Sequence, residues 1–215
     1  NRNEDLLWGW WGKQQTNGWM TAYVLESLLL AKREGYAVDF GNTLQEAADA
    51  LAFWNSAQRI NILYAFNTVD LEAPYQFYLE KVKFDSLHVS GKLKYAIVAE
   101  QTDLPYDTTA VRALFKTDLL GNTYVAEDYS YSLSGSVHNT LLGMHFLRIT
   151  GEEEAKSCLN YMLLARKNGD FNTVNRAAII TALAGEQELS EVKSNMSIQW
   201  DYGPQREVPE NTTLA

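Results

Sequence analysis

The stretch NGWMTAYVLESLLLAKREG, residues 17–35, carries the strongest helix signal in the sequence. Two apolar runs are separated by Glu26 and Ser27 alone, a pattern that predicts a helix buried on most of its circumference. A helix this apolar needs neighbours on nearly every side. We therefore expect residues 20–30 to form the most buried helix of the fold, with Leu28 in the core.

Both ends of this stretch carry helix-capping signals. Asn17 or Thr16 can supply the N-cap oxygen, and Gly35 can take the left-handed conformation that ends a helix. The stretch is not a membrane span, because Glu26 interrupts it and its apolar runs fall far short of about 20 residues.

Composition restricts the class of protein. The chain has 215 residues, 46% of them hydrophobic, which suits one large domain or one domain with an appendage. A net charge of −9 argues against a nucleic-acid surface, and no basic run suggests contact with an anionic membrane. The single cysteine, Cys158, excludes an internal disulfide but leaves the compartment open. Because the chain opens on Asn1 and further polar residues, we interpret it as a piece of a longer protein.

Helical periodicity continues through most of the chain. A tryptophan-rich loop precedes the first helix, Thr43 and Glu46 have capping-box spacing, and Pro74 fits the first turn of a helix. Further helices are predicted at residues 43–54, 56–68, 74–83, 91–101, 107–117, 136–149, 152–167 and 173–184. We expect about nine helices joined by short loops, and no convincing strand before residue 120.

The helices show a weak internal repeat. Thr21, Thr108 and Thr140 each precede an apolar residue by seven positions, and helix pairs recur at the spacing of helical repeat arrays. The pattern favours a repeat architecture, although convergence on buried amphipathic helices would also produce it.

The pattern changes after Leu189. Four apolar residues alternate with polar ones from Met196 to Tyr202, which is the period of a half-buried strand. We predict a helical domain over residues 1–186 and an extended C-terminal tail over residues 187–215. The alternative is an ordinary extension of the helical domain.

Several segments resemble a known family. WGWWG at residues 8–12 and WMTAYVLESLLLAKREGY at 19–36 are similar to the tryptophan-rich loop and TAYVL helix in the thioester-containing domain of alpha-2-macroglobulins. DLLGNTYVAEDYSYSLSGSVHNTLLGMHFLRITG at 118–151 and CLNYMLLARKNGDFNTVNRAAIITAL at 158–183 resemble its last helix pairs. The likeness is to the bacterial branch. It implies an all-α fold, an α/α toroid present as a partial ring of helix pairs, with a short β-leaning C-terminal tail.

The chain departs from this family at the thioester motif, Cys-x-Glu-Gln. Cys158 begins the sequence Cys-Leu-Asn-Tyr, and Val98 stands at the cysteine position of Val-Ala-Glu-Gln. Neither segment can form the thioester bond. We expect no covalent chemistry from this chain.

The resemblance implies a non-catalytic structural and conformational domain of a bacterial alpha-2-macroglobulin-like protease-trapping protein. Such a protein is an endopeptidase inhibitor of the periplasm or cell envelope. The implied partners are neighbouring β-sandwich domains of the same chain, to which the tail would lead, and a target protease held by the whole molecule. No cofactor, nucleic acid or membrane contact is implied. The alternative is an α/α-toroid enzyme, a polysaccharide hydrolase or lyase that uses an aromatic groove and a carboxylate pair.

Four groups of residues could carry chemistry, and we assign no catalytic, cofactor-binding or metal role to any of them. The tryptophans form either a sugar-stacking platform or ordinary packing, and two adjacent acids form either a glycosidase pair or a solvated loop. The histidines lack metal-ligand spacing, and the cysteine is either a reactive thiol or a small buried hydrophobe. The residues are Trp8, Trp10, Trp11 and Trp19; Glu127 and Asp128 with Tyr129 and Tyr131; His88, His138 and His145; and Cys158.

Overall fold

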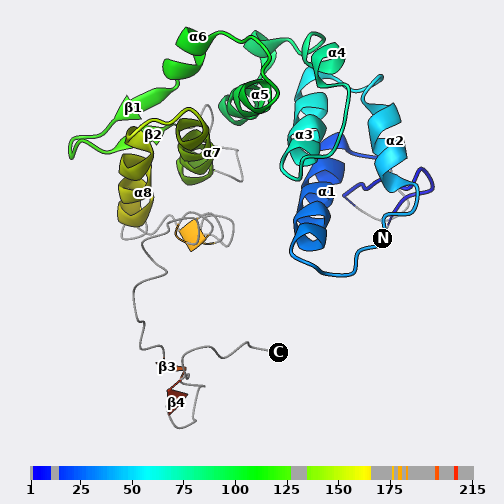
Figure 1. Cartoon of the computed structure of the whole chain (residues 1–215), viewed down its shortest axis with the longest axis horizontal. Helices are drawn as coiled ribbons and strands as arrows, with labels where there is room; N and C mark the ends of the chain where they lie inside the picture. Colours follow the sequence, from blue (N-terminus) through cyan, green and yellow to red (C-terminus); the bar gives the residue numbers. More distant parts are fainter. Residues whose placement is uncertain are drawn as a thin grey trace. The chain divides into compact units, whose positions relative to one another are not determined.

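Helices and one β-hairpin make up most of the described chain (Figure 1). The computed structural model describes residues 2–10, 15–126, 135–165, 176, 179–180, 183, 197–198 and 206–207. The chain divides into two compact units, Asn1–Ile179 and Ile180–Ala215. The first unit contains α1 (Gly18–Arg33), α2 (Thr43–Ala50), α3 (Ser56–Asn67), α4 (Tyr75–Leu79), a 3-10 turn (Phe84–Ser86), α5 (Val89–Gln101), α6 (Thr108–Arg112), β1 (Phe115–Thr117), β2 (Thr123–Val125), α7 (Gly135–Ile149) and α8 (Glu154–Ala165).

The odd-numbered helices form a continuous row. α1 packs against α3, α3 against α5, and α5 against α7. The even-numbered helices α4, α6 and α8 each pack beside a member of this row (Figure 1). This succession of inner and outer helices is the predicted all-α arrangement, a partial ring of helix pairs.

The predicted caps of α1 are confirmed. The Asn17 side chain accepts a hydrogen bond from the Met20 N–H at 2.9 Å. At the other end Gly35 has φ +91°, and the Tyr36 N–H donates to the Ala31 carbonyl at 3.1 Å. The left-handed glycine therefore closes the helix as the sequence predicts.

All four helices of the row end in this same left-handed motif. In each, a residue with positive φ follows the helix, and the next N–H donates to a carbonyl five residues back. The left-handed residues are Gly35, Asp70, Asp103 and Gly151, and the closing bonds run from Tyr36 to Ala31, Leu71 to Phe66, Leu104 to Ala99 and Glu152 to Leu147. This repeated helix ending is a structural repeat that the sequence pattern did not reveal.

α3, and not α1, is the most buried of the described helices. Eight of its 12 residues are buried, because α1 and α5 flank it on both sides. In α1 the buried face includes Leu25 and Leu29, whereas Leu28 is half-buried and Tyr23 is exposed. The expectation that residues 20–30 form the most buried helix is therefore wrong, because only one flank of α1 carries another helix of the row.

The capping box lies at α3 and not at α2. The Asn55 side chain accepts from the Gln58 N–H at 3.0 Å, and the Gln58 side chain accepts from the Asn55 N–H at 3.3 Å. At α2 the N-cap is Asn42, and the Thr43 hydroxyl instead donates to the Leu6 carbonyl at 3.3 Å. The predicted box at Thr43 is wrong because a partner distant in sequence takes its hydroxyl.

A β-hairpin replaces the second half of the helix predicted at residues 107–117. β1 and β2 pair antiparallel with Phe115 opposite Val125, and the hairpin packs on α7. A Cβ atom at Gly143 of α7 would lie 2.8 Å from Val125 Cγ2 and 2.9 Å from Phe115 Cε1. The absence of a side chain at Gly143 makes room for both strands, so the expectation of no strand before residue 120 is also wrong.

Two buried threonines tie helices of the row to the segments that precede them. The Trp8 N–H donates to Thr21 Oγ1 at 3.1 Å, and the Thr21 hydroxyl donates back to the Trp8 carbonyl at 3.0 Å. In α7 the Val125 N–H donates to Thr140 Oγ1 at 3.0 Å. Both threonines are completely buried, whereas Thr108 is exposed. The threonine repeat therefore has a shared structural role at two of its three positions.

The second unit is described at few positions. Ser197–Ile198 (β3) pairs antiparallel with Arg206–Glu207 (β4). The predicted extended stretch, residues 195–202, includes β3, and its other residues lie outside the described ones.

The helix predicted at 173–184 is described at four positions, 176, 179, 180 and 183, and all four are helical.

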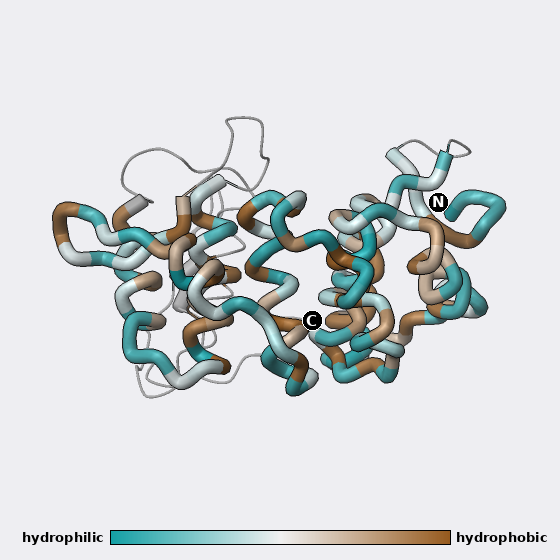
Figure 2. Tube along the Cα trace, turned by 90° about the horizontal axis from the view of Figure 1, so that it is seen from above, coloured by the Kyte–Doolittle hydropathy of each residue, from teal (hydrophilic) through white to brown (hydrophobic). Residues whose placement is uncertain are grey.

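Apolar residues recur along the helices between polar ones (Figure 2). Within the described ranges, no helix has the length and hydropathy needed to cross a bilayer.

The tip of the β1–β2 hairpin is apolar, and its Leu119 and Leu120 are exposed.

Truncating Leu25 should destabilise the protein more than truncating Leu28. Leu25 is completely buried, so Leu25→Ala should lower the free energy of unfolding by about 2–5 kcal/mol. Leu28→Ala, at a half-buried position of the same helix, should cost about 1 kcal/mol. Urea unfolding followed by circular dichroism measures both. Equal losses would contradict the burial described for α1.

The threonine ties should be costly to remove. Thr21→Val or Thr140→Val keeps the side-chain shape but leaves the buried N–H of Trp8 or Val125 without its acceptor. Each change should lower the free energy of unfolding by about 1–3 kcal/mol. The control, Thr109→Val, lies at an exposed position and should be nearly neutral. Unchanged thermal unfolding in both test variants would show that the ties are dispensable.

Candidate functional site

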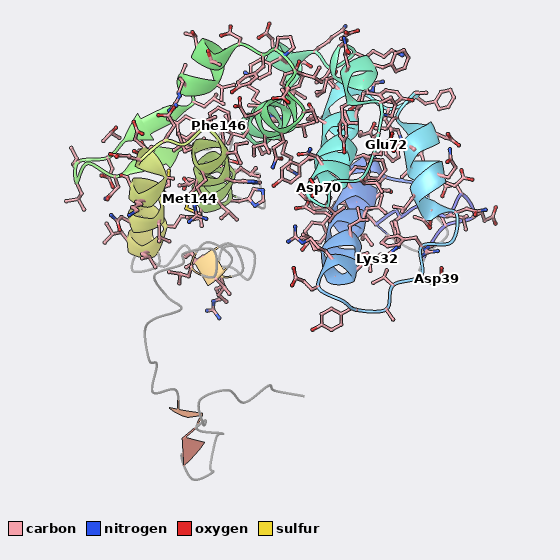
Figure 3. All side chains as sticks on the ribbon, in the orientation of Figure 1. Lys32, Asp39, Asp70, Glu72, Met144 and Phe146 are labelled. Carbon is pink, nitrogen blue, oxygen red and sulfur yellow. The ribbon has the colours of Figure 1, made fainter. Side chains whose placement is uncertain are left out.

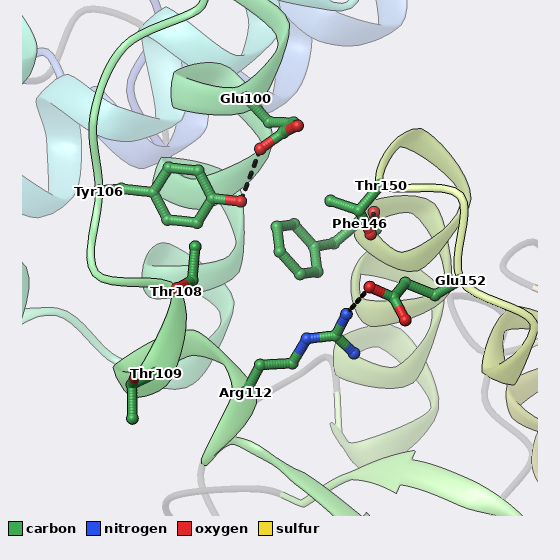
Figure 4. A pocket seen from close by; sticks show the side chains of 8 residues that line it. All are labelled: Glu100, Tyr106, Thr108, Thr109, Arg112, Phe146, Thr150 and Glu152. Carbon is green, nitrogen blue, oxygen red and sulfur yellow. Dashed lines mark hydrogen bonds and ion pairs between the residues drawn. The ribbon is translucent and has the colours of Figure 1, made fainter.

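A cavity of about 510 Å³ lies among the end of α5, the following loop, α6 and the end of α7 (Figure 4). The helix ends position its walls, since Glu100 belongs to the last turn of α5 and Arg112 is the last residue of α6. Phe146 and Met144 lie on α7 (Figure 3), and both are almost completely buried. The residues that line the cavity are Glu100, Tyr106, Thr108, Thr109, Arg112, Phe146, Thr150 and Glu152.

One wall is formed by Glu100 and Tyr106. The Tyr106 hydroxyl donates to Glu100 Oε2 at 2.6 Å, and the Tyr106 ring meets Phe146 edge to face, with centroids 6.1 Å apart and planes at 81°. Burial raises the pKa of the Tyr106 hydroxyl above its usual value, and the hydrogen bond to Glu100 raises it further. Tyr106 therefore keeps its proton and remains a donor at neutral pH.

The opposite wall is formed by Arg112 and Glu152, which form an ion pair (Figure 4). The Arg112 guanidinium also lies 6.0 Å from the centre of the Phe146 ring. The side chains of Arg112 and Glu152 are 38% and 36% exposed, so solvent screens the pair and its net contribution to stability is small.

The cavity brings together two carboxylates, one guanidinium and three threonine hydroxyls. Its chemistry suits the binding of a polar or cationic group more than proton transfer, because Tyr106 and Arg112 engage the two carboxylates. Sequence reasoning missed this site. In the sequence Glu100 stands out only within the Val-Ala-Glu-Gln segment, and Glu152 only as the first residue of the helix predicted at 152–167. In the structure Glu152 precedes α8 and pairs with Arg112.

A second polar cluster lies on the row of inner helices. Lys94 Nζ donates to Asn61 Oδ1 at 2.8 Å and lies 5.0 Å from the centre of the Tyr64 ring. Burial lowers the pKa of Lys94, an effect that the charge of Glu26 opposes. Burial, together with Glu26, raises the pKa of Tyr64. Burial and the nearby Lys94 charge lower the pKa of His138 to about 4. Residues of α1, α3, α5 and α7 are thus linked electrostatically.

The tryptophans divide between the two interpretations. Trp8 is buried, with the Arg2 guanidinium 5.5 Å from its ring, and serves as packing. Trp10 and Trp19 stack at 5.3 Å, and Trp19 stacks on Tyr23 at 5.7 Å, with all three rings about half exposed. Because the rings cover one another's faces, they do not form a flat open platform. Trp11 lies outside the described residues.

The adjacent acids Glu127 and Asp128, with their tyrosine neighbours, lie outside the described residues. Cys158 is completely buried, and burial raises the pKa of its thiol to about 12, which fits a small buried hydrophobe. His145 has a pKa lowered by burial and by Arg148, while His88 is exposed. Among the described residues, no three His, Cys, Asp or Glu side chains are grouped to hold a metal ion.

No protein-family model, curated protein or solved structure matches this chain.

Acidification should destabilise the protein through His138. Its pKa is about 4 in the folded state and near 6.5 when exposed, so the unfolded state binds more protons between these values. The stabilisation is fully present above pH 6.5 and is lost as the pH falls towards 4. From pH 7 to pH 5 the free energy of unfolding should fall by about 1–2 kcal/mol through this group. Urea unfolding at both pH values should show a smaller fall in His138→Gln, and an identical fall would contradict the assignment.

Proposed function

We propose that this chain is a non-catalytic structural and conformational domain of a bacterial alpha-2-macroglobulin-like protein, which traps proteases in the periplasm or cell envelope. The observation that carries the proposal is the reciprocal pair of hydrogen bonds between Trp8 and Thr21. These two residues belong to the two segments that resemble the family, the tryptophan-rich loop and the TAYVL helix. Their direct contact supports reading them as one structural feature, and the row of helix pairs supports the toroid.

The partners and the burial of the potentially reactive side chains support the proposed lack of catalysis. Glu100 accepts the Tyr106 hydroxyl, and Glu152 is paired with Arg112. Cys158 is buried with a raised pKa and stands outside any Cys-x-Glu-Gln sequence. The two carboxylates thus already have partners, and the thiol is buried.

The tip of the β1–β2 hairpin supports contact with neighbouring domains. Leu119 and Leu120 are 104% and 73% exposed. Asp118 fixes the turn, since its carboxylate accepts from the Leu120 and Asn122 N–H groups, both at 2.8 Å. A fixed turn that presents two exposed leucines suits a protein contact, because such apolar surface is stabilised when it is covered.

The test uses the full-length protein to which the chain belongs. We expect β-sandwich domains beside it in that protein, and cleavage elsewhere by an added protease should change both native-gel mobility and hydrogen exchange in residues 18–165. Protease inactivated at its catalytic residue is the control. Absence of β-sandwich domains, or unchanged mobility and exchange after cleavage, would contradict the proposal.

A polysaccharide hydrolase or lyase is the second candidate, favoured by one observation. Glu100 and Glu152 line the same cavity as two aromatic rings. Glycoside hydrolysis needs two carboxyl groups that are free to act on the substrate, whereas Tyr106 and Arg112 already engage Glu100 and Glu152. Release of reducing ends from a polysaccharide panel, lost in Glu100→Gln and retained in Glu153→Gln, would favour the enzyme over the structural domain.

A further inference from the structure

We propose that the cavity of Figure 4 binds the guanidinium group of an arginine side chain presented by a partner protein, with Glu100 as its main anchor. The inference rests on the cavity alone and does not require the proposed family. Its failure would leave the structural role untouched.

The charges around the cavity do not balance. Two carboxylates and one guanidinium line it, and Arg112 is turned to Glu152. Glu100 has a neutral partner, because the Tyr106 hydroxyl donates to Oε2. Among the described lining residues, one negative charge is thus left without a cation, and it lies on the wall opposite Arg112. An incoming cation would meet Glu100 there.

The cavity already holds a guanidinium from its own chain. Arg112 lies over the Phe146 ring and pairs with Glu152, so its head group is bound by an aromatic face and a carboxylate together. The other wall also joins an aromatic residue to a carboxylate, since the Tyr106 hydroxyl donates to Glu100. Aromatic faces attract cations, and a carboxylate bonds a guanidinium fork in two places. Arg112 therefore demonstrates the chemistry that we assign to the opposite wall.

Thr150 offers a further acceptor, which is what a guanidinium needs. Thr150 uses its hydroxyl hydrogen on the carbonyls of Phe146 and Leu147, at 3.1 and 3.2 Å, so its oxygen lone pairs remain for a donor. A guanidinium carries five N–H donors and no acceptor. An anionic ligand would instead face two carboxylates.

The size of the cavity and the charge of the chain agree with this ligand. A volume of about 510 Å³ falls in the range of sites for small ligands, and it accommodates an arginine side chain. The net charge of −9 favours the approach of a basic group.

The first experiment titrates the whole chain with Nα-acetyl-L-arginine amide and follows amide shifts by NMR. Its neutral isostere, Nα-acetyl-citrulline amide, is the matched ligand control. We expect saturable shifts around Thr108 and Thr150 with a Kd of about 1 mM, and binding of the citrulline amide at least about tenfold weaker. Equal binding of the two amides, or no saturable shift with the arginine amide, would overturn the proposal.

Three variants test what each wall of the cavity contributes to binding. Glu100→Gln keeps an acceptor for Tyr106 and removes the charge, so the affinity should fall about tenfold. Glu153→Gln removes an exposed charge next to Glu152 but outside the cavity lining, and the affinity should not change. Arg112→Ala removes the internal cation and leaves Glu152 unpaired, so the affinity should rise. Unchanged binding in Glu100→Gln, or a loss in folded Arg112→Ala, would count against an arginine site.

Discussion

The fold of the first unit depends on the burial of α3 between α1 and α5. Ile60, Leu63 and Phe66 are almost completely excluded from solvent, and helices of the row cover both flanks of α3. Burial on this scale is the main favourable term in folding, but it also forces polar groups of the same helix out of water. The buried Tyr64 and the half-buried Asn61 both contact Lys94 from α5. The inner polar cluster is thus a consequence of how closely the row packs.

The repeated helix endings make the chain turn in the same way after each helix of the row. A left-handed residue after each odd-numbered helix turns the chain at once toward the outer layer. Asp70 and Asp103 adopt this conformation at some cost in free energy, since the left-handed region favours glycine. After α7 the same motif leads directly to Glu152, which carries a negative charge. The Arg112 side chain offsets that charge, so a backbone motif and the α6 sequence together form the second wall of the cavity.

Much of the fold could be predicted from the sequence because its signals are local. The cap at Asn17, the left-handed Gly35 and the apolar periods that mark α3 and α7 all follow from residues within one or two helical turns. The errors have one physical source. The Thr43 hydroxyl has a partner 37 positions away, and the hairpin exists because Gly143 of α7 leaves space for Phe115. Contacts between segments distant in sequence override local propensity, and no local pattern shows them.

The candidate site could not be predicted from the sequence for a related reason, because the cavity exists only where the outer helices are short. α4 and α6 have five residues each, whereas α5 has 13 and α7 has 15. Five residues cannot cover the length of an inner helix, so the ends of the inner helices stay partly open. The cavity at Glu100 lies beside α6, and a second cavity of about 600 Å³, lined by Pro74, Phe77 and Leu104 among others, lies beside α4. Both adjoin the end of α5. Helix periodicity predicted longer outer helices, at residues 74–83 and 107–117, and longer outer helices would have filled both spaces. The surface available to a ligand or partner is therefore set by where the outer layer stops, which depends on the chain after Leu79 and Arg112 leaving the helix to make tertiary contacts.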